Sequence, residues 1–318
     1  MLKTFKYRLY PTKKQTASLE AILEECRYLY NRLLAQRKYA CEIQGASLGY
    51  RHQQNFLLSI KKARPSLAVV HSQVLQNMAV RVDRAFKAFF RRVQAGEEPG
   101  YPRFKCKGWY DSFTFPQAPS GCRIKDGRLA VSKIGHIRMV MHRDLCGRPK
   151  TATINRSSTG KWYVAFSCEM ESHALPPSNA AVGIDVGLCS FAACSHGSVI
   201  DNPRFFREEE KALARAQRKL SRADRGTPER AKRRKIVSRI HERIRFRRNN
   251  FSHQESRKIV NHFGTICVED LSVKRMVHNH CLAKSIADAA WSGFFAMLSY
   301  KAESAGRKLV RVNPAYAT

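Results

Sequence analysis

Residues 181–200, AVGIDVGLCSFAACSHGSVI, contain three short β-forming runs separated by turns. The first run is apolar apart from Asp185, and glycines at positions 183 and 187 stand two residues to either side of that acid. Short apolar runs bounded by turn residues are typical of β-strands. The stretch therefore predicts a three-stranded meander with an acid at the end of its first strand.

The segments that follow this meander extend it into a mixed α/β domain. They predict, in chain order, a basic helical region over 208–262, a buried strand in TICVEDLSV (265–273), a helix over 286–305 and a last strand in KLVRVNP (308–314). The helix prediction depends on Ile286, Ala290, Phe294 and Leu298, which recur at helical spacing. The order of elements is therefore βββ-α-β-α-β, which is that of an RNase H-like nuclease core.

Asp185 and Glu269 are the candidate catalytic and metal-binding residues. If their two strands are neighbours in one sheet, the carboxylates converge at one edge, where they repel each other unless a cation pairs with them. Two Mg²⁺ or Mn²⁺ ions roughly 4 Å apart would resolve that repulsion and are suited to phosphodiester hydrolysis. Strand alternation predicts that Glu269 is the ligand and that Asp270 bonds a backbone amide instead. Taken alone, Asp185 could equally be a strand-end residue satisfied by turn amides.

The first half of the chain predicts a small antiparallel β-barrel. Residues 2–10, LKTFKYRLY, alternate apolar and polar side chains, which is typical of a strand. Five further β-like runs lie at 112–115, 128–131, 136–141, 151–156 and 162–168. Regular short strands separated by turns favour a barrel, and we expect the first strand to belong to it.

Helices are predicted between the first strand and the rest of this barrel, over residues 12–95. Thr12 can cap the first of them. The third carries an apolar stripe from Val70 to Val93, whose aromatic end is most simply the core of a helix bundle. Gln76, Lys87 and Arg91 lie off the stripe and could face solvent or nucleic acid; the Gln76 amide could pair with an adenine edge.

The charge balance indicates a polyanionic partner. The chain has 318 residues with 58 Lys and Arg against 25 Asp and Glu, a formal charge of +33, and 43% hydrophobic residues. This content of core-forming residues excludes a disordered basic tail. Nucleic acid is the favoured partner, with an anionic membrane surface as the alternative. The sequence shows neither a transmembrane run nor a signal peptide.

The ten cysteines include no CxxC pair, so we expect reduced thiols and no zinc site. His278, His280 and Cys281 lie close together in the sequence, where a polar loop is a better interpretation than a metal site.

Residues 203–248 hold 18 Lys or Arg against 6 Asp or Glu. Pairing at i, i+4 cannot neutralise this excess, so phosphate contacts are preferred to a merely solvated helix face. Such contacts position a backbone and read no sequence. The densest points are Lys232, Arg233, Arg234 and Lys235, followed by Arg245, Arg247 and Arg248.

Seven blocks of the sequence resemble the TnpB (OrfB) family of transposon-encoded RNA-guided DNA endonucleases, compact relatives of type V CRISPR effectors. They are FKYRLYPTKKQ (5–15), YNRLL (30–34), GYPRFK (100–105), STGKWYVAF (158–166), GIDVGLCSFA (183–192), VEDLSVKRM (268–276) and VRVNPAYAT (310–318). These blocks are collinear and extend over essentially the whole chain, which makes the resemblance far more specific than a GxDxG pattern alone.

The resemblance implies a wedge β-barrel from residues 1–11 and 96–172, a helical recognition lobe over 12–95, a linker at 173–179 and a RuvC nuclease domain over 180–318. It implies a guide RNA from the right end of the transposon and a double-stranded DNA target beside a short motif. The family's first catalytic Asp corresponds to Asp185 and its catalytic Glu to Glu269. Such a protein would act in the prokaryotic cytoplasm, at the nucleoid.

One departure from the family affects the expected activity. In the family, the block NPAYAT precedes a Cys₄ zinc ribbon and a third catalytic Asp, whereas this sequence ends at Thr318. We therefore expect an incomplete RuvC domain, weakened Mg²⁺ binding, no zinc, and guided DNA binding with little or no cleavage. The alternatives are an active endonuclease and a non-functional truncated remnant. A generic basic RNA-binding protein would leave both acids unexplained.

Overall fold

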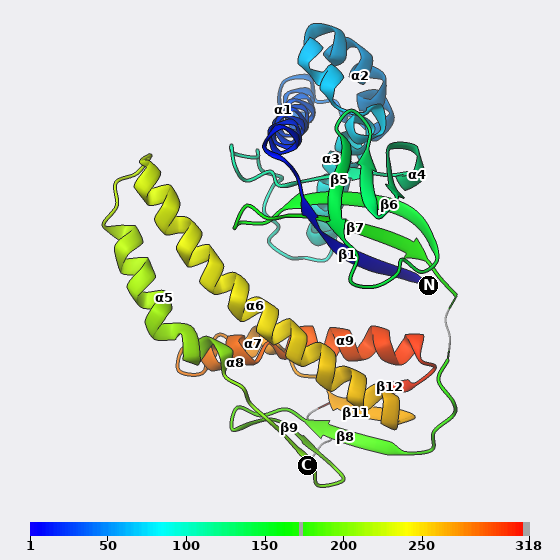
Figure 1. Ribbon diagram of the computed structural model, residues 1–318, viewed down its shortest axis with the longest axis vertical. Helices are drawn as coiled ribbons and strands as arrows, with labels where there is room; N and C mark the ends of the chain where they lie inside the picture. The colour runs from blue at the N-terminus through cyan, green and yellow to red at the C-terminus, as the bar shows by residue number, and fades with distance from the viewer. Residues whose placement is uncertain (172–173, 314–318) are drawn as a thin grey trace. The chain divides into compact units, whose positions relative to one another are not determined.

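The computed structural model describes residues 1–171 and 174–313, and the chain divides into two compact units, Leu2–Met170 and Glu171–Thr318 (Figure 1). The predicted linker 173–179 begins at a residue outside the described part, and the block 310–318 lies outside it from Pro314 onward. No helix in the described residues is long and apolar enough to cross a membrane.

The first unit is built on a seven-stranded antiparallel sheet that forms a nearly closed barrel. The strands are β1 (Leu2–Tyr10), β2 (Ser112–Phe115), β3 (Cys122–Lys125), β4 (Arg128–Val131), β5 (Gly135–Val140), β6 (Arg148–Arg156) and β7 (Trp162–Glu169), in the sheet order β2-β6-β7-β1-β5-β4-β3. β1 pairs with both β7 and β5, although more than 120 residues separate it from either along the chain. The predicted barrel with its N-terminal strand is confirmed.

Helices α1 (Lys13–Gln44), α2 (Tyr50–Ala63) and α3 (Ser72–Gln94), with a 3₁₀ turn at Pro65–Val69, lie between β1 and β2 in the chain. Helix α1 begins with a capping box, in which the Thr12 hydroxyl accepts from the Gln15 amide at 3.2 Å and the Gln15 side chain accepts from the Thr12 amide at 3.0 Å. A four-residue helix, α4 (Ala118–Gly121), precedes β3.

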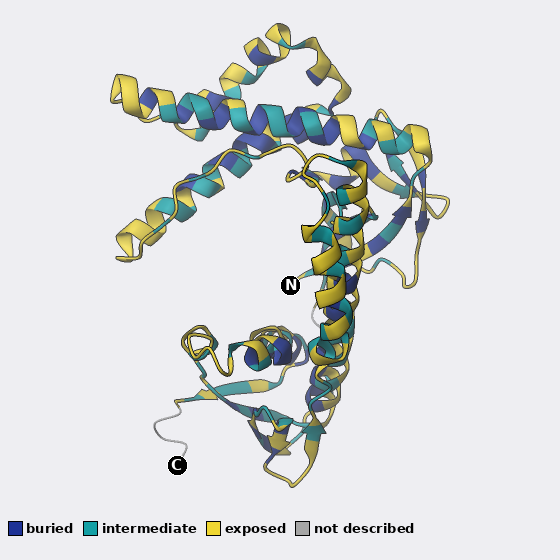
Figure 2. Cartoon of the chain, turned by 90° about the vertical axis from the view of Figure 1, so that its left-hand side faces the viewer, coloured by how far each residue is buried: buried dark blue, intermediate teal, exposed yellow. Residues whose placement is uncertain are grey.

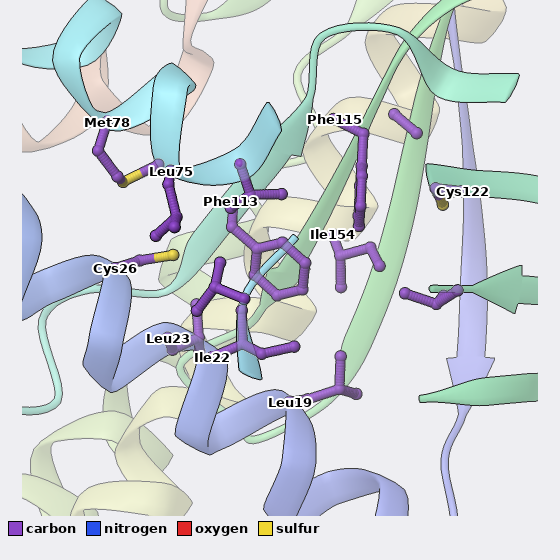
Figure 3. Packing of buried hydrophobic residues seen from close by; sticks show 14 of the residues in the cluster. Leu19, Ile22, Leu23, Cys26, Leu75, Met78, Phe113, Phe115, Cys122 and Ile154 are labelled. Carbon is purple, nitrogen blue, oxygen red and sulfur yellow. The ribbon is translucent and has the colours of Figure 1, made fainter. Parts of the chain in front are cut away.

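One hydrophobic core joins these helices to the inside of the barrel. Leu19, Ile22 and Cys26 of α1 lie against Phe113 of β2 and Ile154 of β6 (Figure 3). All five are at most 5% exposed. Full burial of a large apolar side chain contributes about 1.5–3 kcal/mol, so the barrel and its inserted helices stabilise each other.

The second unit contains a five-stranded mixed sheet in the order β10-β9-β8-β11-β12. Its strands are β8 (Ala181–Asp185), β9 (Ser190–Cys194), β10 (Val199–Asp201), β11 (Thr265–Glu269) and β12 (Lys308–Val312). β8, β9 and β10 form the predicted antiparallel meander, whereas β11 runs parallel to both β8 and β12. The fold class predicted from the sequence is therefore confirmed.

Two helices cover one face of this mixed sheet. Val260 of α6 (Pro228–His262) and Phe294 of α9 (Trp291–Ser304) pack with Ile184, Ile266 and Val268 in one buried cluster. The alternate residues of β8 and β11 are exposed or half-buried, which gives each strand one apolar face and one open face.

The basic region predicted as one helical stretch forms two helices, α5 (Phe205–Ser221) and the 35-residue α6, which together make an antiparallel hairpin. Gly226 has a φ of 88°, which favours glycine, and Thr227 caps α6 with Pro228 at its first position. These residues end one helix and begin the next.

The continuous helix predicted over 286–305 is wrong in one respect. The segment is divided into α8 (Ala283–Ala289) and α9, after a short helix α7 (Val273–Met276). Ala290, at the junction, has a left-handed φ of 56°. Ile286, Phe294 and Leu298 are nevertheless all buried, as their spacing predicts, because the break keeps both helices against the same cluster.

Candidate active site and nucleic-acid interface

Asp185 and Glu269 end two neighbouring parallel strands. The register between β8 and β11 pairs Ile184 with Val268, and the next residue on each strand is one of the two acids. Both acids lie on the open face, because Ile184 and Val268 turn into the core. Adjacent strands are about 4.8 Å apart, so the structure brings the two predicted carboxylates side by side at one edge of the sheet.

An open cleft of about 360 Å³ lies over this edge. Its lining includes Asp185 and Glu269 with small or apolar neighbours such as Gly183, Ala193 and Cys267. Ser195 accepts a hydrogen bond from the Gly183 amide at 2.9 Å, which fixes the turn after β9 against β8. The cleft thus presents two acids on a largely apolar floor.

The neighbouring acid, Asp270, differs from its prediction in one detail. Its own amide donates to the Val312 carbonyl at 2.8 Å, and its carboxylate accepts from the Arg311 guanidinium at 3.1 Å rather than from a backbone amide. Asp270 therefore joins β11 to β12, which leaves Glu269 as the acid of this strand that lines the cleft.

The two carboxylates fit a divalent cation of the Mg²⁺ type. Such an ion is usually held by one or two carboxylates and completes its octahedral shell with water and substrate phosphates. In residues 1–171 and 174–313, no group of three or more His, Cys, Asp or Glu side chains is arranged to hold a metal ion. His278, His280 and Cys281 are among the described residues that form no such group, and all three are exposed.

Arginines in the middle of α6 pair with acids at the start of α5. Arg243 pairs with Glu209 at 2.8 Å, and Arg247 pairs with Glu208 at 2.5 Å and lies 4.5 Å from the Phe205 ring. These pairs join the start of α5 to the middle of α6. The predicted phosphate-contacting residue Arg247 thus already has an anionic partner within the protein.

Arg248 has an even firmer structural partner in Asp288 of α8. Its guanidinium donates to the Asp288 carboxylate at 2.7 and 3.1 Å, and the acid is 6% exposed. The same carboxylate accepts from the Phe206 amide at 2.9 Å, which caps the N-terminus of α5. Asp288 therefore links α5, α6 and α8 through one part-buried ion pair and a hydrogen bond from the Phe206 amide.

The outer part of the hairpin keeps its positive charge. Lys232, Arg234 and Lys235 are exposed and make no ion pair within the described residues. Arg245, nearer the middle of α6, is also exposed and lies beside Phe246. Arg233 pairs with Glu229 at 2.6 Å, one turn away. Figure 2 shows that exposed residues cover most of this outer half.

The predicted residues of α3 have different surroundings. Gln76 and Arg91 are exposed, whereas Lys87 pairs at 2.9 Å with Asp83, which also accepts from Arg37 at 3.1 Å. Gln76 and Arg91 are therefore available to a partner, while Lys87 shares its charge with an acid of its own helix.

Comparison with known proteins settles the family. Residues 165–280 match the OrfB family of IS605 elements, described as "Probable transposase", and residues 1–44 match the helix-turn-helix domain of the same family. A Streptomyces pristinaespiralis protein named "Putative RNA-guided DNA endonuclease" is 34% identical over 316 residues, covering 98% of this chain and 77% of the relative. The chain belongs to the TnpB/OrfB family.

A second TnpB/OrfB relative is the Escherichia coli K12 protein named "Putative RNA-guided DNA endonuclease InsQ". It is 30% identical over 337 residues, covering all of this chain and 82% of the relative. Among solved structures, the complex of Cas12f1 with sgRNA and target DNA matches 99% of this chain and 90% of that chain, with a TM-score of 0.57 and 13% identity. This likeness supports the overall fold of the TnpB/OrfB chain.

The outer face of the TnpB/OrfB barrel carries cations that the sequence reasoning left out. Lys6 lies 4.4 Å from the Tyr163 ring, and Arg8 lies 5.0 Å from the same ring and 5.1 Å from Tyr10. Arg138, opposite Tyr10 in the register, extends this row onto β5. The alternation in LKTFKYRLY points Lys6, Arg8 and Tyr10 outward, so the sequence already indicated that these side chains lie on the outer face of the barrel.

Proposed function

We propose that this chain is an RNA-guided DNA endonuclease that cuts phosphodiester bonds with Mg²⁺ or Mn²⁺ held at Asp185 and Glu269. The placement of these two acids on adjacent parallel strands, facing an open cleft, carries the proposal. The names of the two curated relatives support the same activity. The guide RNA, pairing with one DNA strand beside a short motif, would supply sequence specificity.

The chemistry at the site follows from the two carboxylates. When bound, the divalent ion supplies Lewis-acid polarisation of the scissile phosphate and activates water. Asp185 and Glu269 provide oxygen ligands from fixed strand positions, so the protein does not reorganise to assemble them.

We assign nucleic-acid contacts to the cations that have no acid beside them. These are Lys232, Arg234 and Lys235 on the outer hairpin, Arg245 in the middle of α6 and Arg91 on α3. Arg233, Arg247 and Lys87 each pair with an acid of the protein, and we assign them a weaker share in the same contacts. Arg248 is assigned to holding the hairpin through Asp288. Gln76 remains the candidate for reading the motif beside the target. It lies on one of the helices over 12–95 that we propose as the recognition lobe.

The proposed architecture places the other roles by domain. The barrel of residues 1–11 and 96–172 would act as the wedge that recognises the short motif beside the target together with the helical lobe, and residues 180–318 would form the nuclease domain. We propose that this complex acts on DNA in the bacterial cytoplasm.

A second candidate is guided binding with little cleavage. Two carboxylates, rather than three, line the cleft in the described residues, and this arrangement favours weaker metal binding than a three-carboxylate site. The protein would then occupy targets and block transcription.

One experiment separates the two candidates. RNA that co-purifies with the chain is sequenced, and the complex is then incubated with Mg²⁺ and plasmids that carry a matched target beside a randomised motif. A discrete RNA with cutting next to one motif supports the endonuclease, whereas motif-dependent occupancy without cutting supports the binder. Bulk RNA with neither behaviour would reject both. Asp201→Asn, which changes an exposed acid on β10, is the matched control for Asp185→Asn.

A further inference from the structure

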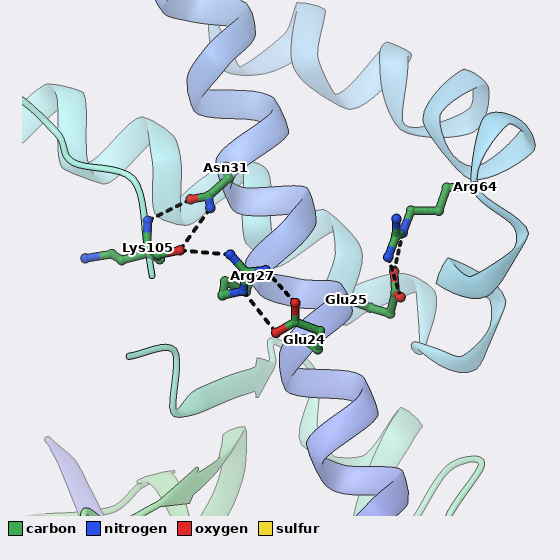
Figure 4. A network of polar contacts seen from close by, with 6 residues as sticks. All are labelled: Glu24, Glu25, Arg27, Asn31, Arg64 and Lys105. Atoms are coloured by element: carbon green, nitrogen blue, oxygen red, sulfur yellow. Dashed lines mark hydrogen bonds and ion pairs between the residues drawn. The ribbon is translucent and has the colours of Figure 1, made fainter. Parts of the chain in front are cut away.

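The loop between α3 and β2 is held in place by side chains of α1, although the loop itself has no regular structure near residue 105. Asn31 pairs with the backbone of Lys105 through two hydrogen bonds: the Lys105 amide donates to Asn31 Oδ1 at 2.8 Å, and Asn31 Nδ2 donates to the Lys105 carbonyl at 3.0 Å (Figure 4). Arg27 donates to the same carbonyl at 3.1 Å and is itself held by Glu24 at 3.0 Å. This clamp fixes the loop.

A tight turn follows the clamp and presents a tryptophan to solvent. The Trp109 amide donates to the Cys106 carbonyl at 3.1 Å, and Gly108, with a φ of 80°, occupies the turn position that favours glycine. Trp109 is 82% exposed, whereas the other two tryptophans, Trp162 and Trp291, are at most 3% exposed. A fixed loop that exposes the largest apolar side chain indicates a binding role.

The charge around this ring indicates what it binds. From Pro99 to Asp111 the sequence contains three cations against one acid, Asp111. Arg103 and Lys107 are exposed, and Phe104 between them is half exposed. Exposed aromatic rings interleaved with cations are typical of surfaces that stack bases and bind the phosphates between them.

We propose that Trp109 stacks on an unpaired nucleobase while Arg103 and Lys107 bind the adjoining phosphates. This inference rests on the proposed nucleic-acid function and adds a contact to it. Every base has a π-face, so the contact tolerates any sequence and positions a strand rather than reading it. Inside a duplex both faces of a base are already stacked, so Trp109 selects unpaired nucleotides or the end of a duplex.

The test uses the fluorescence of Trp109 in the full chain. A labelled single strand of 12 nucleotides is added to the protein. The fluorescence anisotropy of the label measures binding, and the tryptophan emission of the protein measures stacking. Since the other two tryptophans are buried, acrylamide mainly quenches Trp109 in the free protein. We expect saturating oligonucleotide to quench the exposed emission and protect it from acrylamide, and a blunt duplex of equal length to do so less. Trp109→Phe should lack the responding emission.

The effect of the ring on affinity is measured with Trp109→Ala. The control is Phe56→Ala, which removes an exposed ring from α2. We expect Trp109→Ala to weaken binding of the single strand by about tenfold and the control to leave binding unchanged. A rise in anisotropy without any change in Trp109 emission would overturn the stacking proposal and leave the nucleic-acid function standing; the ring would then suit a protein partner. No rise in anisotropy even at low salt would overturn both.

Discussion

The two sheets of this protein differ in how their faces are covered. The antiparallel sheet curls around its own apolar side, so that Phe113 and Phe166 are at most 1% exposed. The mixed sheet is covered by helices on one side, and the alternate residues of β8 and β11 stay accessible on the other. The nearly closed sheet therefore encloses a core and presents cations outside, whereas the open face of the other sheet presents two acids to a cleft.

The strongest test of this contrast is Asp185→Asn on the open face. If the acid holds a metal ion, cleavage should fall by more than the roughly 10- to 100-fold that loss of an outer-shell partner costs. The melting temperature should hardly change, because Asp185 is exposed. Plasmid cleavage and thermal unfolding measure the two effects, with Asp201→Asn as the control. Undiminished cutting by Asp185→Asn would show that the open face is not the active site.

The converse test is Phe113→Ala inside the barrel. Removing this fully buried ring should lower the free energy of unfolding of the first unit by about 3–5 kcal/mol. Ala193→Ser on the open face should change it by less than about 0.5 kcal/mol. Urea unfolding followed by circular dichroism measures both. Equal losses would mean that the two faces do not differ in their contribution to stability.

A third test compares the outer hairpin with another cationic surface. Replacing Lys232, Arg234 and Lys235 with Ala should reduce the slope of log affinity against log salt by about 2 to 3 and weaken guide or target binding roughly ten- to a hundredfold. The charge-matched control replaces Arg51, Lys61 and Lys62 of α2, all exposed. If both triple variants lose the same affinity, the effect is general charge and the hairpin has no special role.

The last test concerns a cation on the covered side of the mixed sheet. Lys301 is 4% exposed, and its amine donates to the His253 carbonyl and the Ser256 hydroxyl, each at 2.7 Å. Burial, and secondarily the charge of Arg257, lowers the pKa of Lys301 to about 8.

The pH dependence follows from that lowered pKa. Between pH 8 and about 10.4 the unfolded chain binds the extra proton, so the free energy of unfolding should rise with pH in this window, by up to about 3 kcal/mol across the whole of it. Subtracting the profile of Lys301→Met from that of the wild type isolates the contribution of this amine. Parallel profiles for the two proteins would contradict the expectation.

Most of the fold could be predicted because local patterns and tertiary structure agree. The alternation in β1 and the apolar runs of β8 and β11 identified the strands, and the same alternation placed Glu269, rather than Asp270, on the face that lines the cleft. The break at Ala290 could not be foreseen, because neither Gly nor Pro marks it. The 122–125 strand was also missed, although strands of the same length at 112–115 and 128–131 were predicted.

The sequence also did not show which charged residues form ion pairs with residues far away along the chain. Arg248 looks like any other cation of its run, yet Asp288, 40 residues away, takes it into a part-buried pair. Arg311 and Asp270 meet because β11 and β12 are neighbours, which only the sheet order reveals. Charge runs therefore predict the sign of a surface, while the fold decides which members of the run remain available.

The construction of the hairpin also has a kinetic consequence. Its cluster of buried residues, Leu213, Ile240 and Ile244, lies toward the inner part, and the outer turns have mostly exposed side chains. Amide hydrogens near the 222–227 connection should therefore exchange by local opening long before those of the sheet. Arg222 and Arg225 are exposed in that connection, so limited trypsin treatment should cut there first. Nucleic acid that covers the hairpin should slow both reactions.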